Sequence, residues 1–182
     1  MIPMKRKRNT TLNIPTINRA LPGRLVAIDP GMKNLGLASF DNHKLIDYCV
    51  KTIPPARLVR ERLQLFDNIL NQYLDEKRPS QIAVEKTTFS SATQTGLLVL
   101  AYYRILAIAR RRSIPVQEYV PIAIRKRVCG NGHATKRDVM KVLISKYPEL
   151  RVFAGVNRRW KERHNFNLFD AVAVGVAHYH NR

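Results

Sequence analysis

Three acidic residues stand at points where apolar segments of the sequence begin or end. Asp29 and Glu85 each close a short apolar run, and Asp170 stands where the last apolar segment begins. Carboxylates that end neighbouring strands meet at one edge of a sheet, where α/β proteins commonly build ligand sites. Clustered carboxylates repel one another unless cations lie between them, and their hard oxygens suit magnesium or manganese. The three positions therefore predict a metal site.

A metal site of this kind suits the hydrolysis of a phosphodiester bond. One ion lowers the pKa of the attacking water, and a second, about 3.5–4 Å away, stabilises the leaving 3′ oxygen. Each acid also has a simpler interpretation. A single aspartate after a strand is usually a turn residue, and Asp170 could be favoured by a helix dipole. From these residues alone, a metal-dependent nuclease and a DNA-binding module without catalysis both stay open.

The charge of the chain favours a nucleic-acid partner. It has 32 Lys and Arg residues against 13 Asp and Glu residues, a formal net charge of +19. Such a field attracts polyanions, nucleic acid first and acidic membrane surfaces second. The two cysteines, Cys49 and Cys129, lack CxxC spacing, so we expect neither a zinc site nor a disulfide and infer a reducing compartment. No apolar run approaches the roughly 18 residues that cross a bilayer, and we expect a soluble protein.

The chain divides into a basic arm, residues 1–24, and a single catalytic domain, residues 25–182. The arm carries six basic residues and no acid, and its apolar residues follow no clear period. We therefore expect it to be flexible. The arm could bind DNA phosphates, serve as a targeting signal, or be a solvated tail with no further role. The sequence leaves these three roles open. The remaining chain is long enough to bury one core without disulfides or a structural metal.

The apolar patterns predict an α/β fold with a mixed sheet flanked by helices. Short β-branched and apolar runs predict five strands, at 25–29, 36–40, 44–50, 81–85 and 115–120. Four helices are predicted. Apolar residues recur at three and four positions in 56–74, whereas 93–112 is apolar on most sides and 135–147 is amphipathic. The last segment, 169–180, has small residues that permit close helix packing. The first three strands should form an antiparallel meander with a turn at Asp41 and Asn42. Thr135 is the expected N-cap of the third helix.

Four segments resemble, in order, the successive motifs of the RuvC family of Holliday junction resolvases. They are IDPGMKNLGLASF, VEKTTFSSATQTG, CGNGHATKRDVMKVL and DAVAVGVAHYH, and the match spans about 25–180. The resemblance implies an RNase H-like, RuvC-type fold with a five-stranded mixed sheet. It implies a homodimeric endonuclease that resolves four-way DNA junctions by paired symmetric nicks, leaving 5′ phosphate and 3′ hydroxyl ends, with the helix 93–112 as the proposed interface. Two Mg²⁺ ions per site are expected, with Mn²⁺ able to substitute.

The resemblance also assigns roles to individual residues. It implies that Asp29, Glu85 and Asp170 are catalytic carboxylates that bind metal, and that Lys136 approaches the scissile phosphate and stabilises developing charge. The DNA-binding residues that we expect beside this site are Lys86, Phe89 and Arg125. An aromatic wedge at Phe89 could repay the unstacking of bases, at about 1–3 kcal/mol per base, but ordinary core packing is an equal alternative.

Two features depart from the family pattern. The family usually has a fourth carboxylate, sometimes a histidine, three residues before the final aspartate, where this chain has Asn167. Residues at i and i+3 share a helix face, so the Asn167 amide oxygen could still bind metal with one less negative charge. His164 is a candidate substitute if the backbone is irregular there, although an exposed loop histidine is the simpler interpretation.

The segment 151–167 is longer than in the family, and its basic residues around Trp160 suit a DNA-contacting loop. The residues of this segment that we expect to bind DNA are Arg158, Arg159 and Lys161.

Other functions remain open beside junction resolution. A broader nuclease for flaps and forks is the nearest, and a non-catalytic junction-binding protein is an alternative for which Asn167 is the only hint. RNase H or transposase activity explains the GNG segment before Lys136 less well. We expect His178 and His180 to be surface residues rather than metal ligands. The expected location is the cytoplasm or nucleoid, or a virus-infected cell, with an organelle or the nucleus as alternatives through the basic arm.

Overall fold

A mixed five-stranded sheet forms the centre of the computed structural model, which describes residues 20–55, 58–86, 96–154 and 159–180. The strands are β1 (Leu21–Asp29), β2 (Asn34–Asp41), β3 (Lys44–Thr52), β4 (Pro79–Glu85) and β5 (Val116–Tyr119), in the order β3-β2-β1-β4-β5. The first three strands pair antiparallel, whereas β4 runs parallel to both β1 and β5. The predicted meander and mixed sheet are confirmed.

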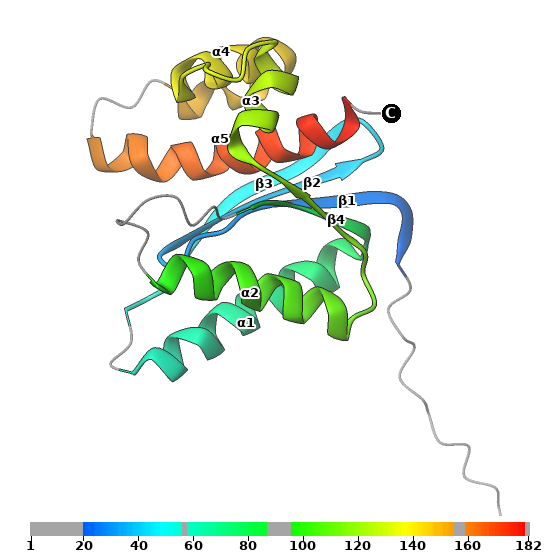
Figure 1. The fold of residues 1–182 in the computed structure, drawn as a ribbon, viewed down its shortest axis with the longest axis vertical. Coiled ribbons are helices and arrows are strands. Elements are labelled where there is room, and N and C mark those ends of the chain that lie inside the picture. Colours follow the sequence, from blue (N-terminus) through cyan, green and yellow to red (C-terminus); the bar gives the residue numbers. More distant parts are fainter. Residues whose placement is uncertain (1–19, 56–57, 87–95, 155–158, 181–182) are drawn as a thin grey trace, which may run out of the picture.

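Helices cover both faces of the sheet (Figure 1). One face carries α1 and α2, and the other carries α5, on which α3 and α4 pack as a further layer. The helices are α1 (Val59–Lys77), α2 (Gly96–Arg111), α3 (Pro121–Cys129), α4 (Lys136–Lys146) and α5 (Arg159–Tyr179), with a 3-10 helix at Pro148–Phe153. In the described residues, no helix is both long and apolar enough to span a membrane.

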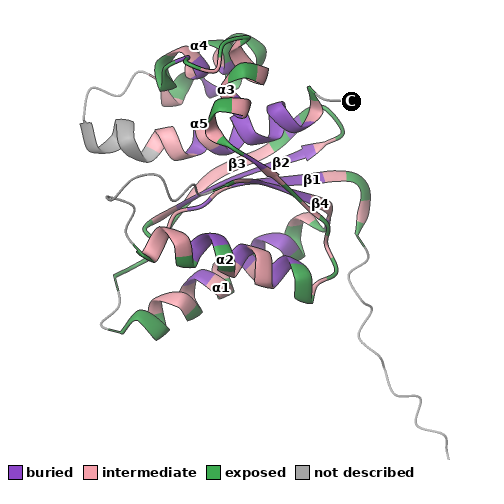
Figure 2. Cartoon of the chain, viewed as in Figure 1, coloured by how far each residue is buried: buried purple, intermediate pink, exposed green. Residues whose placement is uncertain are grey.

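Each face of the sheet buries its own apolar core (Figure 2). Side chains alternate between the faces along β1, so Ala27 packs on the α5 side and Ile28 packs on the α1 and α2 side. The same alternation places Ala83 and Val84 of β4 in the two cores. A strand buried on both faces needs no polar residues between its apolar ones, which is why Ile82, Ala83 and Val84 of β4 follow one another without a polar residue.

Helix α5 approaches β2 closely because a glycine faces the strand. A Cβ atom placed on Gly175 would lie 2.1 Å from Cε2 of Phe40. That separation is far inside van der Waals contact, so no larger residue fits without displacing the helix or the buried Phe40 ring. The small residues of the last segment therefore allow the close packing that the sequence predicted.

Two elements begin at least four residues earlier than the sequence predicted, whereas β2 and β4 each begin two residues earlier. Strand β1 begins at Leu21 instead of residue 25, because the Leu21 amide already donates to the Arg78 carbonyl oxygen at 2.8 Å. Helix α5 begins at Arg159 instead of residue 169. Its first turns consist largely of charged and polar residues that show no apolar stripe, although arginine, lysine and glutamate are good helix formers.

The sequence prediction missed helix α3 altogether. The helix is nine residues long and only Ile124 is buried, so its apolar pattern is too weak to stand out. Its ends nevertheless carry recognisable signals. Pro121 occupies the first turn, where a missing amide hydrogen costs nothing, and Gly130 ends the helix in the left-handed region with φ 73°.

Candidate active site

Parallel pairing of β1 and β4 brings two acidic residues to one edge of the sheet. Ile28 pairs with Val84, so the last residue of each strand, Asp29 and Glu85, lies at the same edge of the sheet. Asp170 reaches them from the interior of α5 rather than from its first turn, which corrects its predicted place at a helix start. The helix dipole acts mainly at the ends of a helix, so it does not explain an acid at this position.

The three carboxylates are close enough to act on one another electrostatically. The pKa of Asp29 is raised well above its usual range by burial, then by the negative charges of Asp170 and Glu85. Burial and Asp170 raise the pKa of Glu85 to about 7, although Lys136 and Arg125 oppose the shift. The structure thus brings together the acidic cluster that the sequence predicted, and in the metal-free protein this cluster tends to retain protons.

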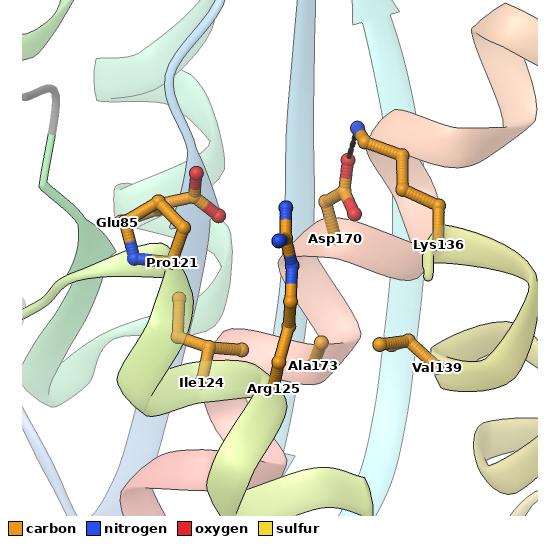
Figure 3. A pocket seen from close by; sticks show the side chains of 8 residues that line it. All are labelled: Glu85, Pro121, Ile124, Arg125, Lys136, Val139, Asp170 and Ala173. Atoms are coloured by element: carbon orange, nitrogen blue, oxygen red, sulfur yellow. Dashed lines mark hydrogen bonds and ion pairs between the residues drawn. The ribbon is translucent and has the colours of Figure 1, made fainter. Parts of the chain in front are cut away.

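A small pocket of about 40 Å³ opens between two of the acids (Figure 3). In Figure 3 the Arg125 side chain rises from α3 and points between Glu85 and Asp170. The Lys136 ammonium binds the Asp170 carboxylate, with Nζ 2.5 Å from Oδ2. The lining comprises Glu85, Pro121, Ile124, Arg125, Lys136, Val139, Asp170 and Ala173. Two cations and two acids therefore converge on one opening.

The start of α4 fixes the position of Lys136. Thr135 is the N-cap, as predicted, and its hydroxyl accepts a hydrogen bond from the Asp138 amide. The Asp138 carboxylate in turn accepts from the Thr135 amide at 2.9 Å, which completes a capping box. Burial lowers the pKa of Lys136, but Asp170 and the other site acids outweigh it, so the pKa is raised overall and the amine stays charged.

The acidic cluster fits a hard divalent cation by its chemistry rather than by a preformed cage. Within the described residues, no three Asp, Glu, His or Cys side chains are gathered closely enough to hold an ion. The donors are nonetheless carboxylate oxygens, and a cation among them would offset the repulsion that raises their pKa values. Lys136 is paired with Oδ2 of Asp170, so a metal ion would bind Asp170 through its other carboxylate oxygen or take the place of the ammonium group.

Asn167 lies beside Asp29 because β2 has a glycine at this point. A Cβ on Gly36 would lie 2.1 Å from the backbone oxygen of Asn167 and 3.1 Å from the Cβ of Asp29. Asn167 also lines a second cavity of about 330 Å³, with Pro30 and Gly31 among its neighbours. The sequence analysis missed Gly36, although an isolated glycine inside a strand often marks a close backbone approach.

Gly36→Ala is expected to lower both stability and activity. The new methyl group would press on the backbone of α5, which cannot yield as a flexible side chain could, so we expect a loss of about 1–3 kcal/mol in the free energy of unfolding. Any catalysis at the acidic cluster should fall as well, because α5 carries Asp170. Urea unfolding and an activity assay would measure the two effects. Gly96→Ala is the matched control, since a Cβ there meets no atom of the described residues within 4 Å. Equal stability of the two variants would contradict the prediction.

The structure places only some of the predicted DNA-contacting residues. Lys86 follows Glu85 at the end of β4, is half-exposed, and forms an ion pair with Glu118. Phe89 and Arg158 lie outside the described residues, so the predictions for them stay predictions. Arg159 and Lys161 lie in the first turn of α5 rather than in a loop, which corrects the predicted loop at this point.

The histidine predictions were partly wrong. His164 lies within α5 rather than in a loop, so the irregular backbone on which its candidacy as a metal ligand depended is not found there. His178 is buried instead of exposed, and its Nδ1 lies 3.1 Å from the Tyr119 hydroxyl. It is buried because the last turns of α5 still pack against the sheet. His180 is exposed, as predicted.

Comparison with known proteins identifies relatives over most of the chain. Residues 25–178 match the family described as crossover junction endodeoxyribonuclease RuvC. The protein of that name from Desulfitobacterium hafniense is 28% identical over 162 residues, which cover 86% of this chain and 92% of the relative. The protein of that name from Chloroflexus aurantiacus is 34% identical over 126 residues, covering 66% of this chain and 76% of the relative.

Solved structures with the same fold include proteins bound to branched DNA. Thermus thermophilus RuvC in complex with a Holliday junction substrate superposes with a TM-score of 0.68 at 24% identity, over 87% of this chain and 93% of that one. The fowlpox virus resolvase in complex with a Holliday junction gives a TM-score of 0.57 at 16% identity, over 87% of this chain and 99% of the other. At these identities the likeness shows a common fold.

Proposed function

The chain belongs to the RuvC family of crossover junction endodeoxyribonucleases and is a Holliday junction endonuclease; we propose that it cuts as a metal-dependent homodimer that makes paired, symmetric nicks. The assignment of this activity rests on the family match over residues 25–178. The convergence of Asp29, Glu85 and Asp170 supports the chemistry, because clustered carboxylates suit metal-assisted hydrolysis of a phosphodiester. We expect each cut to leave a 5′ phosphate and a 3′ hydroxyl.

The proposed metal is Mg²⁺, with Mn²⁺ able to substitute and two ions per site. Asp29, Glu85 and Asp170 would hold the ions, and the amide oxygen of Asn167 would complete the set from the neighbouring turn of α5. Bound ions would supply an activated water and stabilise the leaving oxygen. The raised pKa values support this assignment, since a cation favours the deprotonated form of each carboxyl group.

Lys136 and Arg125 are the proposed phosphate-binding groups of the site. The Lys136 ammonium already lies against Asp170, so a phosphate oxygen that enters the pocket meets it at short range. The Arg125 guanidinium points to the space between Glu85 and Asp170 and can donate to a second oxygen (Figure 3). Both groups would stabilise the charge that develops on the phosphate as the water attacks.

The outer face of α2 supports the proposed dimer. Leu100 and Tyr103 lie three residues apart on this helix and keep 39% and 51% of their surface exposed. Val59, at the start of the neighbouring α1, is also exposed. Exposed apolar side chains are typical of interaction surfaces. A dimer with a two-fold axis would present one active site to each of two opposed strands of a junction.

Cleavage of a labelled four-way junction tests this proposal directly. The junction is compared with linear duplex, flap and fork substrates, in Mg²⁺ and in EDTA, and sedimentation analysis gives the mass of the protein and of its complex. We expect metal-dependent, symmetrically placed nicks confined to the junction, and a dimer in both measurements. Equal cutting of every branched substrate would show the broader nuclease instead. Tight binding without any cutting would show a non-catalytic junction-binding protein.

Asn167→Asp is expected to reduce the Mg²⁺ concentration needed for half-maximal cleavage, by about tenfold. The change adds a negative charge at the proposed metal site without altering the size of the side chain, and the number of charged ligands tunes the affinity for hard cations. A titration of the cleavage rate with Mg²⁺ measures the shift. If the midpoint and the maximal rate both stay unchanged, Asn167 does not contribute to the metal site.

A further inference from the structure

Lys86 follows Glu85 directly, yet its side chain belongs to a different cluster. The Lys86 ammonium pairs with Glu118 of β5, with Nζ 3.4 Å from Oε2. The same carboxylate oxygen accepts a hydrogen bond from the Tyr102 hydroxyl of α2 at 2.6 Å. Tyr102 is buried in the core between the sheet and helices α1 and α2, so it provides a fixed anchor for Glu118.

The backbone supports the same arrangement. The Lys86 amide donates to the Tyr119 carbonyl oxygen at 2.7 Å, which extends the parallel pairing of β4 and β5 one residue beyond Glu85. Tyr102, Glu118 and Lys86 therefore connect α2, β5 and the end of β4. We call these three side chains the Tyr102 network.

The network keeps the Lys86 charge away from the metal site. Among the described residues, the Lys86 ammonium forms its ion pair with Glu118 of β5 and not with the adjacent carboxylate of Glu85. At 3.4 Å the ion pair is loose, and half of the Lys86 side chain remains exposed. An ammonium group has three donors, so Lys86 can keep Glu118 as one partner and still meet a DNA phosphate.

We propose that Glu118 is a positioning residue for junction binding and cleavage: anchored by Tyr102, it holds Lys86 beside the active site as a phosphate contact. The inference rests on the proposed function, because the phosphate belongs to the junction strand that runs past Glu85. Glu118 itself touches no DNA in this arrangement. It acts by limiting where the Lys86 ammonium can go, so that the cation neither folds back toward Glu85 nor swings freely in solvent.

The sign of the binding change separates positioning from general electrostatics. Removing an acidic charge from a DNA-binding protein should by itself tighten binding, because DNA is a polyanion. If Glu118 positions Lys86, Glu118→Gln should instead weaken junction binding, by about threefold, and slow cleavage at saturating protein by about tenfold. Glutamine preserves an acceptor for the Tyr102 hydroxyl, so only the charge is lost. The matched control is Glu149→Gln, which removes an exposed acid from the 3-10 helix, and it should leave binding unchanged or slightly tighter.

The experiment compares Glu118→Gln, Lys86→Gln and the double variant in a double-mutant cycle. Junction Kd values are measured in EDTA, so the network is judged even if the protein fails to cut and the proposed function falls. We expect the double variant to bind no more weakly than Lys86→Gln alone. Additive losses, or tighter binding by Glu118→Gln, would overturn the proposal. Tyr102→Phe is the second variant if Glu118→Gln does not fold, and it should weaken binding in the same direction.

Discussion

Replacing Asp29 with asparagine is expected to lower the rate of junction cleavage by about a thousandfold or more while junction binding persists. Metal ions supply several kcal/mol to the stabilisation of a phosphodiester transition state, and each 1.36 kcal/mol is a factor of ten in rate. Asparagine is the same size as aspartate, so the end of β1 should keep its packing. Single-turnover cleavage in Mg²⁺ and junction binding in EDTA measure the two effects separately.

The control for Asp29→Asn is Asp75→Asn, which makes the same chemical change at an exposed position on α1. Glu85→Gln and Asp170→Asn should resemble Asp29→Asn in cleavage. Asp170→Asn differs in one respect, because it also removes the partner of Lys136 and leaves that cation able to bind phosphate more tightly. Loss of junction binding in all three variants would show that the acids maintain the structure of the DNA-binding face rather than serve in catalysis.

The sequence was sufficient to predict the strand-end acids because their signal is local. An apolar run that stops at an acid can be recognised without knowledge of the fold, and Asp29 and Glu85 both end strands as expected. That the two strands are parallel neighbours is a matter of topology, and an α/β pattern with a crossover helix between the strands favours it. Asp170 was assigned to the cluster, but its helix was expected to begin ten residues too late, because the first turns of α5 show no apolar stripe.

What the sequence did not reveal depends on contacts between distant residues. The short helix α3 buries only Ile124, so its hydropathy pattern did not predict a helix. The sequence therefore did not indicate that Arg125 projects from a helix into the site. The role of Gly36 depends on the backbone of Asn167, which is more than 130 residues away in the chain. The bond from Tyr102 to Glu118 is likewise invisible in a pattern of apolar residues. Such contacts follow from the packing of whole elements.

The metal-free protein is expected to lose stability as the pH rises from 5 to 8. The pKa of Glu85 is about 7 in the folded protein against an ordinary value of 4.5, so the folded state holds its proton more tightly than the unfolded state does. Between these two values the folded state binds more protons, and the free energy of unfolding falls with increasing pH. For Glu85 alone the loss is about 3 kcal/mol at most, and the raised pKa of Asp29 acts in the same direction.

Glu85→Gln isolates this effect, because glutamine cannot ionise. In EDTA at pH 8 the variant should unfold at a higher temperature than the wild-type protein. Near pH 3.5, a unit below the ordinary pKa of 4.5, wild-type Glu85 is largely protonated in both states, and the two proteins should be similar. Mg²⁺ should raise the unfolding temperature of the wild-type protein more at pH 8 than at pH 5.5, since protons compete with the metal for the same carboxyl groups. A variant that is less stable than the wild-type protein at pH 8 would show that the Glu85 carboxylate is held by favourable contacts, and that the site does not need a cation to offset its charge.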